Sequence, residues 1–307
     1  MNNNRFSIIA DEEGKRLDVF LSEKLSITRT RVKGMIEGGH VRLGGKVPKS
    51  SAKLRKGAAL EGEIPPEEPF SLTPEAIPLD ILYEDEYILA VNKPDGMVVH
   101  PSFGHKEGTL VNAALAYLGE ERLKGDEETE IPNHRPGIVH RLDKGTTGVI
   151  LIAKDIRTQE KLSSLFKDRA VRKTYRAIVE GVMKRDEGII EGHIGRHPVE
   201  RKKMAVVKEK GREALTWFKV IERMKEFTYV EVYPKTGRTH QIRVHLAHIG
   251  HPVVGDEPYG KKARRLAGRP LLHAYAITFG HPAKDGTVSI TAPVPEDMEE
   301  FIAAHEM

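Results

Sequence analysis

The side chains of this sequence that are best placed to do chemistry lie in one short polar loop. Asp143 stands between two cations, Arg141 and Lys144, and small turn residues then lead into the apolar run 149–153. The β-branched and aliphatic character of that run is typical of a buried strand, so the loop would hold a carboxylate at the edge of a core. Nearby cations favour the ionised form of a carboxylic acid. An ionised carboxylate can act as a nucleophile or stabilise positive charge that develops on a substrate.

Two further side chains could act with this carboxylate if the fold brings them together. Tyr175 falls in the segment 173–181, which has strand character, and Arg243 falls in 237–250, where apolar residues recur at helical spacing. Each of the three residues also has an ordinary structural interpretation: Asp143 as a turn carboxylate, Tyr175 as a core aromatic and Arg243 as a surface cation. The combination, rather than any single member, therefore indicates a catalytic site.

The composition limits which other chemistries are available. The 307 residues include no cysteine, which excludes disulfides, thiolate nucleophiles and cysteine-ligated metal centres. The charged fraction of 31% and the mean hydropathy of -0.43 are typical of a globular protein. The sequence has no run of about 18 apolar residues and no apolar signal-peptide core, so we expect a cytoplasmic protein that has no contact with a membrane.

The N-terminal part of the chain carries the excess positive charge. Between residues 24 and 56, ten basic residues stand against the single acid Glu37, a surplus of nine, whereas the whole chain has a surplus of four. This concentration on a small unit indicates a nucleic-acid-binding module. The residues of this unit that we expect to bind RNA are Arg29, Arg31, Lys33, Arg42 and Lys46.

Local patterns predict the elements of this basic unit. Apolar residues at helical spacing predict a short helix within 15–22, and Thr28 is a candidate cap for a second helix that ends at Gly38. The segments 40–43 and 46–49 then flank a Gly-Gly turn and predict a β-hairpin. The expected module is therefore a small α/β unit.

A change in composition marks a boundary between two domains. Residues 61–69 are rich in acidic residues and proline, a composition that tends to stay extended. We therefore place a linker at 65–77, between a basic RNA-binding domain at 1–64 and a larger domain at 78–307.

The larger domain combines many short strands with few helices. Strands are expected at 79–83, 87–93, 149–153, 173–181 and 271–279 and in several runs between 188 and 233; helices are expected after Thr109, at 158–167, within 237–250 with Thr239 as its cap, and after Pro295. The polar segment 119–132 is expected to be a surface excursion. Successive strands without regular helical crossovers indicate an α+β fold with a largely antiparallel sheet.

Histidines in the predicted helix invite the hypothesis of a metal site. They are His240, His245, His248 and His251. Their spacing argues against a metal, because no glutamate separates His245 from His248 as in zinc proteases and the first nearby carboxylate is that of Asp256. We therefore expect structural or RNA-contacting histidines and no metal. Phosphate-binding glycine loops and a Gly-x-Ser-x-Gly motif are also missing, so we expect no nucleotide cofactor and no Ser–His–Asp triad.

Five ordered motifs in the larger domain resemble those of the RluA family of RNA pseudouridine synthases. They are His140-Arg141-Leu142-Asp143 with Thr146-Thr147-Gly148; Lys173-Thr174-Tyr175; Gly-Arg-Thr-His-Gln-Ile-Arg-Val-His at 237–245; Gly255-Asp256 with Tyr259-Gly260; and Leu272-His273-Ala274. The likeness extends from about residue 78 to the C-terminus, and it is greatest to the D-type members that modify large-subunit ribosomal RNA. The basic N-terminal unit resembles a small RNA-binding domain that is also found in a small-subunit ribosomal protein.

The resemblance implies a fold, an activity and roles for individual residues. It implies a pseudouridine synthase domain, a mixed sheet flanked by helices, that acts on RNA as a monomer and needs no cofactor. Position by position, Asp143 is the catalytic aspartate, Tyr175 the active-site tyrosine and Arg243 the cation that pairs with the aspartate. We expect Tyr175 to stack on the uracil and to act as general base for the proton that is lost. Arg141 matches the arginine that helps to displace the target base. The run Arg201-Lys202-Lys203 would add phosphate contacts.

The chemistry implied by the resemblance agrees with the missing cofactor motifs. Isomerising uridine breaks the N1–C1′ bond, turns the uracil and joins C5 to C1′, so no group is gained or lost. Three roles for Asp143 are open at this point: attack on C1′, attack on the base, or assistance to an elimination that forms a glycal. Two alternative functions are also open: a sister synthase that acts on transfer RNA, and a non-catalytic RNA-binding factor in ribosome assembly.

Overall fold

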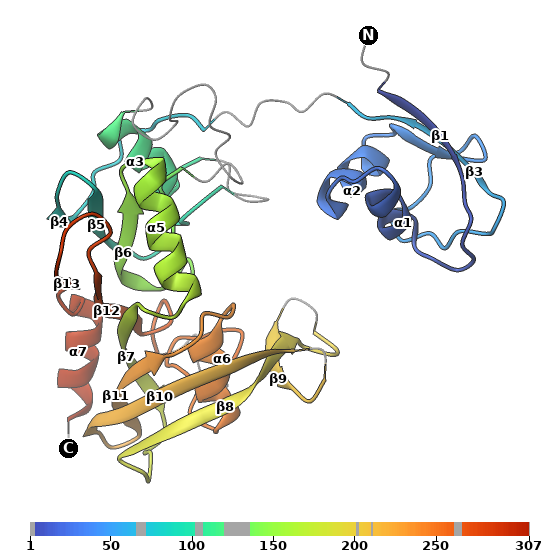
Figure 1. Cartoon of the computed structure of the whole chain (residues 1–307). Coiled ribbons are helices and arrows are strands. Elements are labelled where there is room, and N and C mark those ends of the chain that lie inside the picture. Colours follow the sequence, from blue (N-terminus) through green and yellow to red (C-terminus); the bar gives the residue numbers. More distant parts are fainter. Residues whose placement is uncertain are drawn as a thin grey trace. The chain divides into compact units, whose positions relative to one another are not determined.

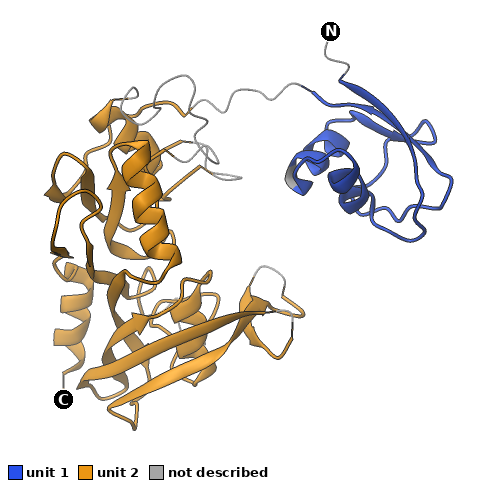
Figure 2. Ribbon diagram, viewed as in Figure 1, with its two compact units in different colours: residues 1–71 blue, residues 72–307 orange. Residues whose placement is uncertain are grey.

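The computed structural model describes residues 4–65, 72–101, 107–119, 136–200, 203–209, 211–260 and 266–306. The chain divides into two compact units, residues 1–71 and 72–307 (Figure 2). Each unit has its own sheet and its own buried hydrophobic core. Most of the predicted surface excursion, residues 120–132, lies outside the described residues.

The first unit combines two helices with a small antiparallel sheet (Figure 1). Its elements are β1 (Arg5–Ile9), α1 (Leu17–Lys24), α2 (Arg29–Glu37), β2 (Val41–Leu43) and β3 (Ala59–Glu63), and the strand order is β1-β3-β2. Leu17, Phe20 and Leu21 of α1 are completely buried in a core that includes Val32 and Ile36 of α2. The helical spacing of these apolar residues thus predicted both helices correctly.

The start and end of α2 follow from single residues. The side chain of Thr28 accepts a hydrogen bond from the backbone N–H of Arg31 at 3.3 Å, which satisfies one of the unpaired donors at the helix start. The helix ends at Gly38, whose N–H donates to the carbonyl of Gly34. The predicted cap is confirmed.

The predicted hairpin of the first unit is wrong in its second strand. Leu43 and Lys46 form a single bridge, but β2 then pairs with β3 instead of with residues 46–49. Pro48 has no N–H to donate to a ladder, whereas Leu60 of β3 fills the core. As a result, residues 61–63 belong to β3 and not to the extended acidic stretch, and β1, which was not predicted, covers the other edge of β3.

The second unit is built on a ten-stranded mixed sheet. Its strands are β4 (Ile81–Glu84), β5 (Ile88–Lys93), β6 (Thr147–Ala153), β7 (Arg172–Glu180), β8 (Glu187–Arg196), β9 (Met204–Val207), β10 (Arg212–Arg223), β11 (Phe227–Pro234), β12 (Leu272–Gly280) and β13 (Thr287–Thr291). They run in the order β4-β5-β6-β12-β7-β11-β10-β8-β9, and β13 pairs with β12. In the described part of the chain, the one parallel pair is β6 with β12. The predicted α+β fold with a largely antiparallel sheet is confirmed.

Helices cover both faces of this sheet (Figure 1). They are α3 (Leu110–Leu118), α5 (Ile156–Lys167), α6 (Gln241–His248) and α7 (Glu296–His305). Ile150 of β6 packs in one cluster with Leu110 of α3, whereas Val149 and Leu151 pack in another with Leu162 of α5. Strand β6 is therefore buried on both faces, which explains why its sequence is a continuous apolar run.

The two remaining helices cover the other half of the sheet. Ile242 of α6 packs with Phe218 and Val232, while Phe301 of α7 packs with Tyr229. Val232 and Tyr229 belong to the same strand, β11, and Val232 is the third residue after Tyr229, so their side chains point to opposite faces. Helix α6 thus lies on one face of the sheet and α7 on the other.

Gly148 allows β6 to lie beside β12. Its φ is +107°, and a Cβ atom at this position would lie 2.3 Å from the carbonyl oxygen of Ala274 on β12. A side chain is therefore excluded on two grounds, backbone conformation and space. This close approach sets the position of the loop that precedes β6, in which Asp143 lies.

Candidate active site

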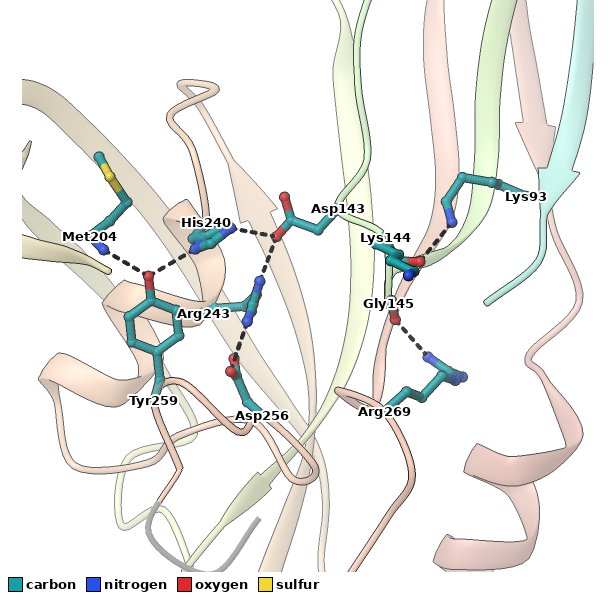
Figure 3. Close-up of polar contacts among 10 residues, drawn as sticks. All are labelled: Lys93, Asp143, Lys144, Gly145, Met204, His240, Arg243, Asp256, Tyr259 and Arg269. Carbon is teal, nitrogen blue, oxygen red and sulfur yellow. Dashed lines mark hydrogen bonds and ion pairs between the residues drawn. The ribbon is translucent and has the colours of Figure 1, made fainter. Parts of the chain in front are cut away.

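The backbone of the Asp143 loop is held by a buried lysine. Lys93, at the end of β5, is completely buried, and its Nζ donates to the carbonyl oxygens of Pro94, Met97 and Lys144 at 2.7, 2.9 and 3.1 Å. Burial lowers the pKa of its ammonium group to about 8. Because Lys144 follows Asp143 directly, Lys93 fixes the peptide next to the carboxylate (Figure 3).

Arg243 connects two carboxylates. It lies in α6 and is 7% exposed; its Nη1 donates to Oδ2 of Asp143 at 2.9 Å. Its Nε and Nη2 donate to the two oxygens of Asp256 at 2.7 and 2.8 Å, and Asp256 is completely buried (Figure 3). Burial alone would lower the pKa of Arg243, but the two carboxylates outweigh burial and raise it. The ion pair between Asp143 and Arg243 that was expected from the sequence is therefore present.

Tyr175 lines the same cleft as Asp143 from strand β7. It is directly opposite Val232 of β11 and Ala274 of β12, and its partly buried ring packs with apolar clusters on the α3 and α6 side of the sheet. Burial, and then the charge of Asp143, raise the pKa of its hydroxyl. The phenol therefore stays protonated at neutral pH and offers an aromatic face and a hydrogen-bond donor.

His240 lies between Asp143 and a second tyrosine. Its Nδ1 is 2.8 Å from the hydroxyl of Tyr259, and its Nε2 is 3.9 Å from Oδ2 of Asp143 (Figure 3). The hydroxyl of Tyr259 also accepts a hydrogen bond from the backbone N–H of Met204 at 3.0 Å. His240 is the N-cap of α6, with φ +56°, so the prediction of Thr239 as the capping residue is wrong. The left-handed conformation of a non-glycine residue was not visible in the sequence.

Two other histidines of this segment, His245 and His251, make polar contacts within the fold. His245 is completely buried, with its Nδ1 2.9 Å from the hydroxyl of Thr216, and Nδ1 of His251 is 2.9 Å from the carbonyl oxygen of Glu180. Among the residues that the structure describes, no three histidine, aspartate or glutamate side chains are grouped so that they could hold a metal ion.

The cleft around these residues is strongly cationic. Its volume is about 580 Å³. Asp143 is the one carboxylate among its described lining residues, whereas eight cationic side chains line it: Arg141, Lys167, Arg169, Lys173, Arg212, Lys235, Arg238 and Arg243. Arg141, which was expected to act on the RNA, is exposed at the cleft. A cationic cleft of this kind suits a polyanion, one unit of which can reach the carboxylate of Asp143.

The five cations of the first unit that were predicted to bind RNA differ from one another in their contacts. Arg29 pairs with the buried carboxylate of Asp18 at 2.7 Å, and Lys33 pairs with Glu37 at 3.5 Å. Arg31 donates to the carbonyl of Pro65, Arg42 donates to the carbonyl of Gly45, and Lys46 is exposed. Arg29 and Lys33 therefore have carboxylate partners, whereas Arg42 and Lys46 have none among the described ion pairs.

The third predicted cluster of RNA contacts is described only in part. Arg201 and Lys202 lie outside the described residues. Lys203 pairs with Glu200 at 2.7 Å, and its neighbour Met204 begins β9.

Several residues in or beside the cleft were not predicted to take part. Asp256 and Tyr259 fall in a motif that carried the family resemblance, but their contacts with Arg243 and His240 were not predicted. The lining cations Arg169 and Arg212 come from segments that carry no motif. Only the folded chain brings these segments to the carboxylate.

Comparison with known proteins places this site in a family. Residues 87–248 match the family described as RNA pseudouridylate synthase, and residues 15–60 match the S4 domain. The chain belongs to the RNA pseudouridine synthase family. The synthase isomerises uridine in RNA to pseudouridine.

The similarity of the synthase to known relatives extends over nearly the whole chain. It is 40% identical to an uncharacterised RNA pseudouridine synthase of Bacillus subtilis (strain 168), over 97% of each chain. It is also 40% identical to the ribosomal large subunit pseudouridine synthase D of Neisseria meningitidis (serogroup A), over 94% of this chain and 78% of that one.

A solved structure resembles the larger part of the synthase. Human RNA pseudouridylate synthase domain containing 4 matches with a TM-score of 0.57 and 25% identity, over 74% of this chain and 94% of that one. None of the described helices of the synthase is long and apolar enough to span a membrane.

Proposed function

We propose that this synthase modifies uridines of large-subunit ribosomal RNA and that Asp143 is the residue that reacts with the target nucleotide. The observation that carries the proposal is the ion pair of Asp143 with the buried Arg243 in a cleft whose other Arg and Lys residues add positive charge. The cations attract the RNA backbone, while the one carboxylate meets the nucleotide that enters. The name of the Neisseria meningitidis relative supports the ribosomal target.

The reaction needs a group that can interact with the charge that develops on the sugar. When the N1–C1′ bond breaks, positive charge develops on the sugar and negative charge on the uracil; C5 then bonds to C1′, C5 loses its proton and N1 gains one. In the three roles that are open for Asp143, the carboxylate attacks C1′, attacks the base, or assists an elimination that forms a glycal. In each of these roles, Arg243 holds the carboxylate in place.

Tyr175 is proposed to hold the uracil while the bond to the sugar is broken. Its ring lines the cleft beside Asp143, and an aromatic face can stack on a base that is free to turn. The raised pKa of its hydroxyl favours this role, because a protonated phenol does not remove the proton from C5.

Arg141 is proposed to replace the target base in the RNA. The base must leave its stack to reach the cleft, at a cost of a few kcal/mol. The exposed guanidinium of Arg141 is two residues from Asp143 and can offset that cost by filling the gap.

The basic unit is proposed to supply affinity for RNA. We assign residues 1–64 to an RNA-binding domain, 65–77 to a linker and 78–307 to the catalytic domain. The match of 15–60 to the S4 domain and the surplus of nine positive charges between 24 and 56 support this division. Phosphate contacts are assigned to Arg29, Arg31, Lys33, Arg42, Lys46 and residues 201–203.

We further propose that the synthase acts in the cytoplasm as a monomer. The cytoplasm follows from the proposed ribosomal substrate. The proposal of a monomer is supported by the site, because Asp143, Tyr175 and Arg243 of a single chain line one cleft.

Mapping of pseudouridines tests the substrate. In RNA from a deletion strain, specific pseudouridines of large-subunit ribosomal RNA should be lost, and the wild-type gene but not Asp143→Asn should restore them. Loss from transfer RNA alone would instead support the sister synthase. Unchanged maps of both RNAs would contradict the proposal.

A further inference from the structure

A chain of three polar contacts ends at the carboxylate of Asp143. The backbone N–H of Met204 donates to the hydroxyl of Tyr259 at 3.0 Å, this hydroxyl lies 2.8 Å from Nδ1 of His240, and Nε2 of His240 lies 3.9 Å from Oδ2 of Asp143 (Figure 3). The four residues come from the loop before β6, the start of α6, the loop that follows α6 and the start of β9. None of the three contacts includes Arg243.

The available protons favour one tautomer of His240. The hydroxyl of Tyr259 already accepts from Met204, so its own proton is free to be donated to Nδ1 of His240. Nδ1 then carries no proton, and a neutral imidazole carries it on Nε2, facing Asp143. In the other tautomer, a lone pair on Nε2 would face the negatively charged oxygen, which is unfavourable.

The backbone at His240 indicates that its side chain is held in place for a purpose. His240 is a non-glycine residue with φ +56° and ψ +22°, a conformation that costs about 1 kcal/mol or more for residues with a side chain. The side chain makes no capping hydrogen bond to α6, although it occupies the N-cap position. Its contacts are instead with Tyr259 and toward Asp143.

We propose that His240 is a positioning residue for Asp143, with its proton held on Nε2 by Tyr259 and directed at Oδ2 of the carboxylate. The distance of 3.9 Å closes to a hydrogen bond when RNA fills the cleft, since such contacts are often long without substrate. The proposal rests on the proposed function, in which Asp143 is catalytic.

In this arrangement the two carboxylate oxygens of Asp143 have different roles in the reaction. Arg243 donates to Oδ2, and Nε2 of His240 is directed at the same atom. No described residue donates a hydrogen bond to Oδ1. Two donors on one oxygen fix the rotation of the carboxylate and leave Oδ1 to act on the nucleotide.

Spectroscopy of the whole enzyme without RNA tests the tautomer directly. The protein is labelled with 15N-histidine, and long-range 1H–15N correlation shows which ring nitrogen carries the proton; the signals of His240 are those that disappear in His240→Asn. We expect the proton on Nε2 in the wild type and loss of this preference in Tyr259→Phe. A proton on Nδ1 in the wild type would overturn the proposal. This result does not depend on activity, so it is separate from any failure of the proposed function.

A double-mutant cycle tests whether Tyr259 acts through His240. Asparagine tolerates the left-handed conformation and caps helices well, so His240→Asn keeps the backbone but removes both contacts. Tyr259→Phe keeps the ring that packs beside His240 and Arg243. We expect each variant to lower kcat at least about tenfold with KM for RNA changed less than about twofold, because a hydrogen bond to a charged group is lost.

The double variant separates positioning from a structural role. If Tyr259 acts through His240, adding Tyr259→Phe to His240→Asn changes kcat less than about twofold. Multiplication of the two single effects, or a rise in KM with kcat unchanged, would overturn the proposal. Tyr117→Phe in α3 is the matched control, because it removes an exposed hydroxyl that donates to Glu84 of β4 at 2.8 Å and should leave kcat unchanged.

Discussion

Asp256 holds two nitrogen atoms of Arg243 and leaves the third, Nη1, to Asp143. The bidentate contact at 2.7 and 2.8 Å is completely buried on the side of Asp256, whereas Asp143 remains partly accessible. Such a contact fixes the plane of a guanidinium, because its donors form a rigid fork. Asp256 therefore aims Arg243 at Asp143.

Asp256→Asn should lower both activity and stability. Asparagine keeps the shape but removes the charge and one acceptor, so we expect kcat to fall at least tenfold and the free energy of unfolding to fall by about 2–4 kcal/mol. Single-turnover kinetics and urea denaturation measure the two effects. Asp186→Asn, at an exposed ion pair with Arg223, is the control and should change neither. Equal activity of Asp256→Asn and the wild type would contradict the positioning of Arg243 by Asp256.

Gly148→Ala should unfold or strongly destabilise the second unit. The added Cβ would lie 2.3 Å from the carbonyl oxygen of Ala274, in a backbone conformation that alanine avoids, so we expect a loss of at least about 4 kcal/mol. Gly250→Ala is the matched control: its φ is +88°, but nothing lies within 4 Å, so we expect a loss of only about 1 kcal/mol. Thermal unfolding compares the two. Equal losses would show that the close approach of β6 and β12 is not what requires glycine.

Acid should destabilise the second unit through two buried histidines. Burial lowers the pKa of His245 and of His273 to about 4. The unfolded chain binds these two protons near pH 6.5 and the folded chain does not, so their contribution to stability is present above pH 6.5 and is lost as the pH falls toward 4. Together they add up to about 2–3 kcal/mol per pH unit in that window.

Urea denaturation between pH 7 and 4.5 measures this slope. His273→Asn should reduce it by about one proton, whereas His193→Asn, at an exposed position on β8, should not change it. An unchanged slope in His273→Asn would contradict the neutral state of the buried ring.

Removal of two accessible cations from the first unit should weaken RNA binding in a salt-dependent way. Arg42 and Lys46 have no carboxylate partner among the described ion pairs. Replacing both by glutamine should reduce the slope of log K against log salt by up to about 2, with kcat unchanged. Lys219→Gln is the control, because Lys219 follows Phe218 on β10 and points away from the α6 face. An unchanged slope in the double variant would remove these residues from the RNA contacts.

Local patterns predicted the elements well, for physical reasons that particular residues show. Thr28 and Thr109 cap their helices with their own side chains, so both starts could be predicted from the sequence. The pairing of β2 could not, because it depends on Leu60, which is distant in sequence and fills the same core. Strand pairing is decided by packing more than by local preference.

The candidate site, too, could be predicted only in part from the sequence. Asp143, Tyr175 and Arg243 were predicted because motifs carry them, and the ion pair of Asp143 with Arg243 is present. The left-handed backbone of His240 and the bidentate contact of Arg243 with Asp256 were not predicted, because both follow from long-range packing. Tertiary contacts, rather than residue types, complete the site.

Tritium release from RNA that contains 5-tritiated uridine tests the central claim most directly. Asp143→Asn removes the charge of the carboxylate but leaves the cations of the cleft, so we expect RNA binding within about threefold of the wild type and no detectable tritium release. Tritium release by Asp143→Asn at the wild-type rate would contradict the assignment of Asp143 as the reacting residue.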